Sequence, residues 1–457
     1  MARLSQIFSI NFTGGIISPG YLQEVLNIAT AAQVTQVRFG LRQQLYVEVQ
    51  NKYCKQFENA CREKHIVLSQ TPNISSSYAA TDIFIPDSWL KEGIYKDIFD
   101  LFETPPKLKI NICDSQQTFM PFFTGHINWI ASAHAHYWYL YIRLPGQQST
   151  YCWPELIYTN SIPQVSRFLE EHMTQIPEKL CDYIGRPKDK ELDLPVFHLP
   201  YYEGFNKYNN QYWLGIYRRD EEFSVAFLKD LCSICLETGV GQLYATSWKS
   251  IIVRDIEPAH RRLWDYALGK HGINVRHAAN ELNWQIADNC EDSLILKRHI
   301  IRHFDTADVR TYGLCFSIRM QPGNSHFGAI VIRKQENKYN SKLKYMQRFD
   351  ILYTADFNPN SSTLVLYRDN VTKEHLGPYI VSLCKHYYEK GSEWDVLQQY
   401  VAEQQPAPVN SAPEKMVLQC PCCMSIYEEG QGEQCYICET EISAFKEVPF
   451  STLIQTT

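Results

Sequence analysis

The 457-residue sequence lacks several features that would assign it directly to a class of proteins. No apolar run approaches the roughly 18 residues that a membrane-spanning helix needs. The first residues lack the charged and apolar regions of a secretory signal. There is no basic excess either, because 50 acidic and 44 basic residues give a net charge of −6. We therefore expect a cytoplasmic protein that binds neither membranes nor nucleic acids.

The cysteines do not form a disulfide framework. Most of the 15 stand singly within apolar stretches, as reduced thiols in a protein core do. A glycine-rich phosphate loop with its lysine and a GxSxG nucleophile turn are also missing. Motifs therefore identify no catalytic residue. Among the cysteines, a group of four near the C-terminal end departs from the pattern of single, buried thiols.

Two CxxC pairs form the strongest motif in the sequence. Cys420 and Cys423 are followed by eleven residues and then by Cys435 and Cys438. Two such pairs at this distance can enclose one tetrahedral metal ion with four thiolates. Metal binding is expected to drive the folding of so small a segment. The sequence thus predicts a metal site made of these four cysteines.

The identity of the metal depends on the neighbouring residues, because four thiolates accept iron and zinc equally by geometry. Tyr427 lies four residues after Cys423, and Phe445 lies seven residues after Cys438. These spacings resemble rubredoxin, and the resemblance implies one iron per chain. The segment between the pairs is shorter than in rubredoxin, and two usual glycines and the usual proline are replaced by Met424, Glu439 and Tyr436. A zinc ribbon is therefore the alternative.

The tail is acidic and lies beyond a proline-containing segment. Residues 414–450 contain seven Glu and two Lys, a net charge of −5, and residues 402–415 contain three prolines. The latter composition predicts a semi-extended linker, followed by a metal domain over residues 416–450. An acidic redox module suits a partner protein with a basic face, so we expect a redox partner such as a reductase or an assimilatory enzyme.

The preceding body contains an internal repeat. Residues 41–65 and 247–271 share a strand, a connector and an amphipathic helix at a constant offset of 206 positions (41 to 247, 65 to 271), and both end in Lys-His. Each copy follows another helix, over residues 20–32 in the first and 222–238 in the second. This order predicts an α+β body with pseudo-two-fold symmetry.

One strand of the first copy has an unusual charge pattern. Residues 37–47 alternate between apolar and polar positions and predict a single strand, with Arg38 and Arg42 on its polar face. Two arginines on one face suit carboxylates or another anion. A solvated strand face with salt-bridged arginines is the alternative.

The segments 15–19 and 37–44 resemble the ferredoxin-like half-domain of the nitrite and sulfite reductases. The resemblance covers roughly residues 8–335, and the repeat supplies the two halves that this family has. It implies two ferredoxin-like half-domains, within residues 1–185 and 186–401. In that family the halves frame a sirohaem beside a four-iron cluster.

The cysteines that hold this cluster, spaced C-x5-C and C-x3-C in the family, are missing from the chain. By the family pattern, Ser77, Ile83, Ser115 and Phe119 stand at the ligand positions, and Cys113 is two residues out of register. Serine, isoleucine and phenylalanine cannot replace cluster thiolates. We therefore expect no four-iron cluster.

Sirohaem is not expected either, because the cysteine that bridges it to the cluster is missing. Arg38 and Arg42 align with the carboxylate-binding strand of the family. They would still suit an anionic tetrapyrrole or a small oxyanion.

These inferences combine into one expected function. The sequence predicts a rubredoxin-type electron-transfer accessory protein on a cluster-less nitrite/sulfite reductase-like scaffold, which serves nitrogen or sulfur assimilation. It favours a redox carrier over a stand-alone enzyme. The alternatives are a sirohaem-binding reductase of altered ligation and a zinc-stabilised regulatory or assembly protein.

Overall fold

The computed structural model describes most of the chain, in two units that comprise Met1–Tyr387 and Tyr388–Thr457. The described residues are 4–81, 83–84, 89–145, 150–172, 175–197, 199, 201–276, 278–321, 327–336, 347–361, 363–404, 416–422, 426–427, 434, 438, 441 and 446–449. Each unit is considered separately below.

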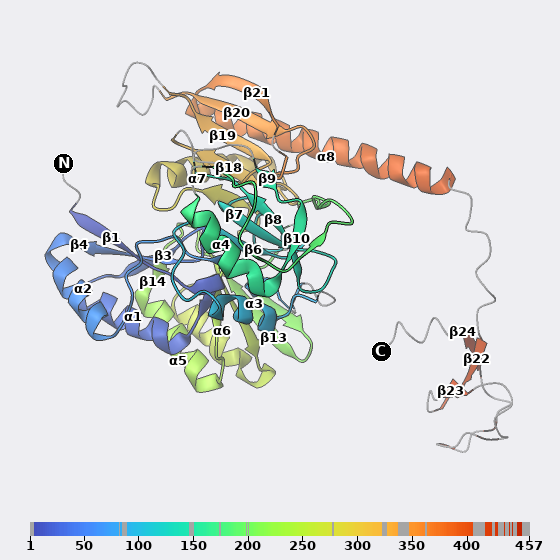
Figure 1. Ribbon diagram of the computed structural model, residues 1–457, viewed down its shortest axis with the longest axis horizontal. Helices are drawn as coiled ribbons and strands as arrows, with labels where there is room; N and C mark the ends of the chain where they lie inside the picture. The colour runs from blue at the N-terminus through green and yellow to red at the C-terminus, as the bar shows by residue number, and fades with distance from the viewer. Residues whose placement is uncertain are drawn as a thin grey trace. The chain divides into compact units, whose positions relative to one another are not determined.

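The first half of the body contributes three strands to a four-stranded antiparallel sheet and packs two helices against it (Figure 1). Its elements are β1 (Ser5–Ile10), α1 (Pro19–Ala31), β3 (Gln36–Phe39), β4 (Leu45–Gln50) and α2 (Cys54–Glu63). Pro19 starts α1 at a position where its fixed φ suits a helix and its missing N–H has no intrahelical partner.

The second half repeats this arrangement with one additional edge strand. Its elements are β12 (Gly204–Tyr208), β13 (Gln211–Ile216), α5 (Val225–Thr238), β15 (Leu243–Ala245), β16 (Ile251–Ile256) and α6 (Arg261–Lys270). Adding 206 to the bounds of β1 and β4 gives the bounds of β13 and β16 exactly. The predicted repeat and the α+β pseudo-two-fold body are confirmed.

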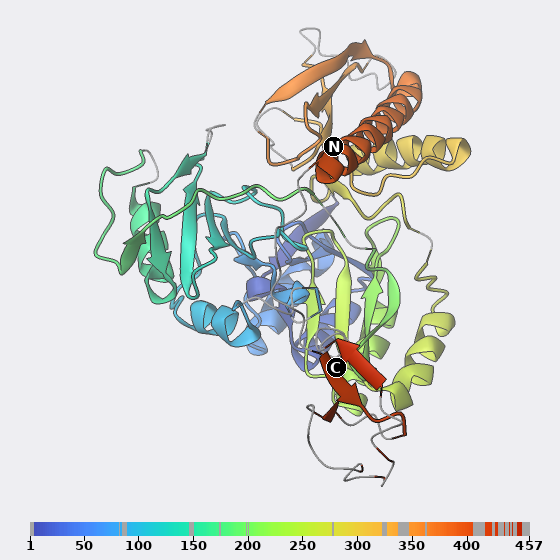
Figure 2. The same cartoon turned by 90° about the vertical axis from the view of Figure 1, so that its right-hand side faces the viewer.

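Short strands exchanged between the halves join them into one body. β2 (Ile16–Ile17) pairs with β15 of the second half, and β14 (Phe223–Ser224) pairs with β3 of the first. The helices α1 and α5 also pack against each other, and Figure 2 shows the two halves side by side. Apolar residues of both halves form one core, including Phe8, Leu22, Leu214 and Leu228. This buried apolar surface stabilises the pairing.

A second sheet follows the first half in the sequence. Its order is β11-β10-β8-β7-β6-β5, with β9 paired to β8. The elements of this part are β5 (Ser75–Ser76), α3 (Glu92–Asp100), β6 (Ile110–Cys113), β7 (Ile127–Ala131), β8 (Tyr137–Ile142), β9 (Tyr151–Cys152), β10 (Glu155–Tyr158), α4 (Ile162–Glu171) and β11 (Gly185–Pro187). Every residue of β6 and β7 is buried, as in a central strand covered on both faces.

A third sheet follows the second half. Its elements, in sequence and sheet order, are β17 (Trp284–Ile286), β18 (Phe316–Arg319), β19 (Ile330–Lys334), β20 (Phe349–Thr354) and β21 (Leu364–Val371). The helix α7 (Glu291–Ala307) and the start of α8 (Lys373–Gln404) share its core. The described part of the body also contains five 3₁₀ turns: Thr13–Gly15, Asn51–Tyr53, Tyr78–Ala80, Thr159–Ser161 and Pro258–His260.

The tail contains a small antiparallel sheet of β22 (Met416–Gln419), β23 (Ile426–Tyr427) and β24 (Lys446–Pro449), with β22 in the centre. The helix α8 extends to Gln404 and so includes the start of the predicted linker; residues 405–415 lie outside the described residues. The predicted domain boundaries stay predictions. Across the described residues, no helix is long and apolar enough to cross a membrane.

Candidate functional site

The predicted single strand over residues 37–47 is wrong, because the chain reverses within it. β3 ends at Phe39, β4 starts at Leu45, and the Gly40 N–H donates to the Gln44 carbonyl oxygen at 2.8 Å. Gln43 takes a positive φ of 62°. Alternating polarity cannot distinguish a straight strand from a hairpin whose turn is itself buried. The turn places Leu41 and Arg42 at the edge of a cavity.

Arg42 is held by neutral oxygen atoms. Its guanidinium donates to the carbonyl oxygen of Asn73 at 3.1 and 2.6 Å, to that of Ile110 at 2.6 Å and to Oδ1 of Asn111 at 3.0 Å. Burial lowers the pKa of Arg42 to about 10. These four hydrogen bonds fix the side chain without adding a carboxylate, so its charge is available to the cavity.

The cavity has a volume of about 580 Å³, and several basic side chains line it. Lys109, His126 and Arg143 lie there with Arg42, immediately before β6, before β7 and after β8. Burial, and then the charges of Arg42 and Arg143, lower the pKa of Lys109. Burial, followed by Lys109, Arg143 and Arg42, lowers the pKa of His126 to about 4. His126 is therefore neutral at pH 7, and the three other side chains make this wall cationic.

Asp288 is an acidic residue in the cavity lining. Its carboxylate accepts the Leu41 N–H at 3.0 and 3.3 Å and the Tyr46 hydroxyl at 3.3 Å. The Lys249 ammonium lies 3.5 Å from its Oδ1. Burial raises the pKa of Asp288, opposed by the Lys249 charge and the Leu41 hydrogen bond. The carboxylate is thus fixed in place by three donors.

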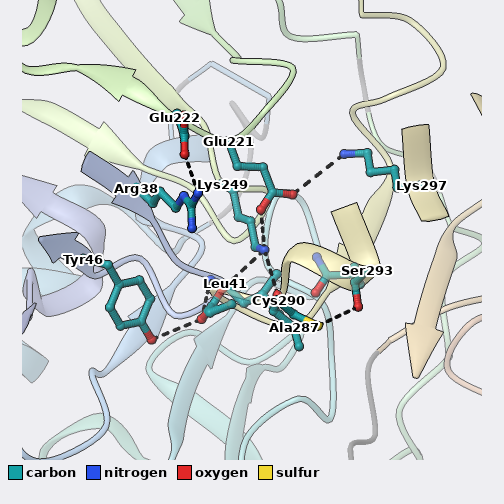
Figure 3. A network of polar contacts seen from close by, with 12 residues as sticks. Arg38, Leu41, Tyr46, Glu221, Glu222, Lys249, Ala287, Cys290, Ser293 and Lys297 are labelled. Carbon is teal, nitrogen blue, oxygen red and sulfur yellow. Dashed lines mark hydrogen bonds and ion pairs between the residues drawn. The ribbon is translucent and has the colours of Figure 1, made fainter. Parts of the chain in front are cut away.

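Lys249 belongs to a chain of buried charges that also includes Glu221 and Lys297 (Figure 3). Lys249 Nζ is 2.6 Å from Oε2 of Glu221, and Lys297 Nζ is 3.9 Å from Oε1 of the same carboxylate. Lys297 also donates to the Tyr217 hydroxyl at 2.7 Å. Burial acts to lower the pKa of Lys249, but Glu221 and Asp288 outweigh it, so the pKa is raised. Buried charges are tolerated when paired in this way.

The other predicted arginine, Arg38, has a different environment. It lies on β3 and forms an ion pair with Glu222, and it does not line the cavity. Figure 3 shows the two side chains pointing toward each other. The salt-bridged alternative describes this contact, whereas Arg42 contributes to a basic cavity. Anion binding by Arg38 and Arg42 stays a prediction.

The positions expected to have lost cluster ligands are occupied by packed side chains. The Ser77 hydroxyl lies 2.6 Å from the Tyr95 hydroxyl and accepts the Asp114 N–H at 2.8 Å. The Phe119 ring is buried, with centroids 4.9 Å from Tyr202 and 5.0 Å from Phe84. A four-iron cluster does not fit these residues, which offer hydroxyl and aromatic groups in place of thiolates.

The thiol of Cys113, two residues from an expected ligand position, does not change this conclusion. Cys113 is fully buried in β6, and burial raises its pKa well above the ordinary value. Ser115 and Ile83 are half-buried. An inert, buried thiol is typical of a structural cysteine.

Two of the four predicted metal ligands can be placed. The sulfur atoms of Cys420 and Cys438 lie 3.5 Å apart, too far for a disulfide. Two thiolates on one tetrahedral ion with metal–sulfur bonds near 2.3 Å would be about 3.8 Å apart. Cys423 and Cys435 lie outside the described residues. Within the described part of the chain, no group of three or more His, Cys, Asp or Glu could hold a metal ion.

Sequence reasoning missed most of the cavity. Lys109, His126, Arg143 and Asp288 come from separate segments and share no motif. Lys249 could have been singled out from the sequence, because the repeat offset of 206 places it at the position of Gln43 in the first half (43 to 249). Both residues occupy the same turn position with positive φ values of 55° and 62°. A lysine in place of the glutamine marks where the two halves diverge.

Comparison with known proteins supports the fold. No protein-family model matches the sequence, and no curated protein matches it. The structure resembles that of the NirA protein of Mycobacterium tuberculosis, with a TM-score of 0.60 and 14% identity, over 82% of this chain and 80% of that chain. This likeness confirms the predicted nitrite/sulfite reductase-like α+β fold of the body. It gives no support for a rubredoxin-type tail.

Proposed function

We propose that this chain is a cytoplasmic electron-transfer accessory protein, with one iron bound by Cys420, Cys423, Cys435 and Cys438. The observation that carries the proposal is the 3.5 Å separation of the Cys420 and Cys438 sulfurs, one from each CxxC pair. Pairs that are 15 residues apart in sequence (420 to 435) meet only if the segment folds around a common point. Iron held by four thiolates would supply one-electron transfer.

The small sheet around the cysteines is consistent with such a centre. β22 leads directly into Cys420, and its Leu418 pairs with Tyr427 of β23 and with Glu447 of β24. A sheet of ten residues in all, with four in β22, two in β23 and four in β24, cannot bury a core large enough for independent stability. Bound metal would provide the missing stability. Zinc would satisfy the same thiolates, so the metal must be identified by experiment.

Metal analysis together with the visible spectrum of the purified chain tests the proposal. We expect one iron per chain, thiolate-to-iron absorption, and reversible bleaching on reduction. Cys438→Ser should reduce the bound iron, whereas Cys384→Ser, which alters a buried body cysteine, should leave it unchanged. A colourless protein with one zinc after growth in iron-rich medium would refute the redox role and favour the regulatory alternative.

The body supplies the second part of the proposal, which is binding of a small oxyanion in the basic cavity. Arg42, Lys109 and Arg143 place three cations around about 580 Å³ of space. Burial lowers the pKa of all three, and the neighbouring arginines lower the pKa of Lys109 further; a bound anion would favour their charged forms. Titration calorimetry with sulfite should show saturable binding, weakened at least about tenfold by Lys109→Met.

The strongest competing function is a reductase that holds sirohaem with altered ligation. A specific observation favours it: a second cavity of about 580 Å³ shares Thr124, Arg143 and Phe327 with the first. It adds the aromatic side chains of Phe122, Phe123 and Tyr141 and a further cation, Arg319. An aromatic and cationic space suits a planar carboxylated ligand. Absence of tetrapyrrole absorption after co-expression with sirohaem synthesis would refute this function.

A redox partner completes the proposal. The net charge of −5 over residues 414–450 would direct the tail to a basic surface. Binding to the partner should therefore weaken steeply as ionic strength rises.

A further inference from the structure

We propose that Asp288 makes the basic cavity selective for oxyanions that carry a proton, so that the bound anion and the carboxylate share one hydrogen. The inference rests on the proposed binding of an oxyanion in this cavity. It adds the chemical class of the ligand and the residue that selects it.

The position of the carboxylate is the first step. Asp288 lines the cavity together with Arg42 and Lys109, and 18% of its side chain stays exposed. The Leu41 N–H, the Tyr46 hydroxyl and the Lys249 ammonium hold it from the turn of the first half, from β4 and from the turn between β15 and β16. An entering anion therefore meets a carboxylate that is fixed by three elements.

Hydrogen-bond chemistry gives the second step. An ionised carboxylate only accepts hydrogen bonds, and so does a fully deprotonated oxyanion. Two such groups in contact repel each other unless one proton lies between them. Phosphate and hydrogensulfite retain a proton near neutral pH, whereas sulfate, nitrate and nitrite do not. The first group can donate to Asp288 while its other oxygens face the cationic side chains.

Cations near Asp288 favour the ionised form of its carboxyl group. Lys249 forms an ion pair with Asp288 and another with Glu221. The Asp288 charge in turn acts to raise the pKa values of Arg42 and Lys109, which line the same cavity. Tyr46 is a hydrogen-bond donor whose own pKa is raised above its ordinary range. Binding of a proton-free anion must then take up a proton, so its affinity should fall as the pH rises.

Phosphate and sulfate form a matched pair of probes, because both are tetrahedral and of similar size and they differ in the proton. Titration calorimetry on the full chain, in buffers of different ionisation enthalpy between pH 6.5 and 8.5, measures affinity and proton uptake together. We expect phosphate to bind at least about tenfold more tightly than sulfate. A sulfate oxygen facing the Asp288 carboxylate without a proton between them should cost more than about 1.4 kcal/mol. Sulfate binding should take up about one proton.

Asp288→Asn gives the decisive comparison, because the amide can donate to the anion and carries no charge. We expect sulfate to bind at least about tenfold more tightly than in the wild type, with no proton uptake. Asp230→Asn is the matched control, since Asp230 pairs with Lys270 and His271 and does not line the cavity.

An unchanged phosphate-to-sulfate ratio in Asp288→Asn would overturn the inference while leaving anion binding intact. If neither probe nor sulfite binds the wild type, the anion-binding part of the proposed function fails, and the inference fails with it. Should Asp288→Asn not fold, the wild type decides alone: sulfate binding without proton uptake overturns the inference.

Discussion

Replacing Lys249 by glutamine, the residue at the same turn position in the first half, should destabilise the body by about 4 kcal/mol. Lys249 and Glu221 are buried, with 3% and 6% of their side chains exposed, and lie 2.6 Å apart. Removing one partner leaves a buried carboxylate whose nearest remaining cation, Lys297, is 3.9 Å away. Breaking a buried pair typically costs about 3–5 kcal/mol.

The expected change in melting temperature follows from the size of this unit. Unfolding entropy is about 2.1 cal/mol/K per residue, which for Met1–Tyr387 gives about 0.8 kcal/mol/K. A loss of about 4 kcal/mol then lowers the melting temperature by about 5 °C. Scanning calorimetry on the full chain measures this shift.

Two further variants separate the buried pair from general damage. Lys64→Gln removes a partner from the Lys64–Glu24 pair, whose side chains are 58% and 48% exposed, and should cost less than about 1 kcal/mol. The double variant Lys249→Gln/Glu221→Gln removes both charges and should recover at least about half of the loss. A Lys249→Gln shift no larger than that of Lys64→Gln, or a double variant no better than the single one, would refute this account.

Three other predictions concern titration and anion binding. The pKa of His126 in the folded protein is about 4, below its ordinary value, so the unfolded chain takes up a proton first as the pH falls from 6.5 to 4. His126→Asn keeps an acceptor for the Lys109 N–H and should flatten the loss of stability over this range, by about 1 kcal/mol after solvent screening, as measured by urea unfolding. Burial lowers the pKa of Lys297 to about 8, so the folded protein should gain stability between pH 8 and 10.5. Lys297→Met should remove about 2–3 kcal/mol of that gain. Thermal melts whose dependence on pH is the same in the variant as in the wild type would contradict this prediction. Arg42→Lys cannot reproduce the four guanidinium hydrogen bonds and should weaken sulfite binding about tenfold or more in titration calorimetry, whereas equal affinity would show that the guanidinium does not contact the anion.

The sequence was sufficient for the repeat because the same apolar alternation sets the strands of both halves. β1 and β4 recur as β13 and β16 without a single-residue slip, since a slip would turn their buried faces to solvent. The pattern was insufficient at the turn between β3 and β4. There Gln43 is buried, and its side-chain amide donates to the carbonyl oxygens of Ser76 and Ala245. These partners are distant in the sequence, so a local pattern cannot predict the contacts.

The cavity could not be predicted because its residues meet only in three dimensions. Asp288 accepts the N–H of Leu41 from 247 positions away in the sequence, and Lys109 and Arg143 flank different strands of the second sheet, β6 and β8. Arg38 and Arg42 were equivalent in the sequence, two polar positions on one expected strand. The reversal of the chain between them sends Arg38 to Glu222 and Arg42 to the cavity.

The hydrogen bonds of Arg42 explain how the body can keep a basic cavity without thiolates at the positions where the resemblance places cluster ligands. The carbonyl oxygens of Asn73 and Ile110 hold the guanidinium, and the same two segments lead to Ser77 and Ser115. Backbone oxygens do not depend on the side chains that follow them, so thiolates can be replaced there without releasing Arg42. An anion bound in this cavity would have no adjacent iron–sulfur centre to supply electrons, and the described thiols of the body are buried or scattered. For this physical reason we propose electron transfer for the four cysteines of the tail and anion binding for the body, and the two proposals have separate tests.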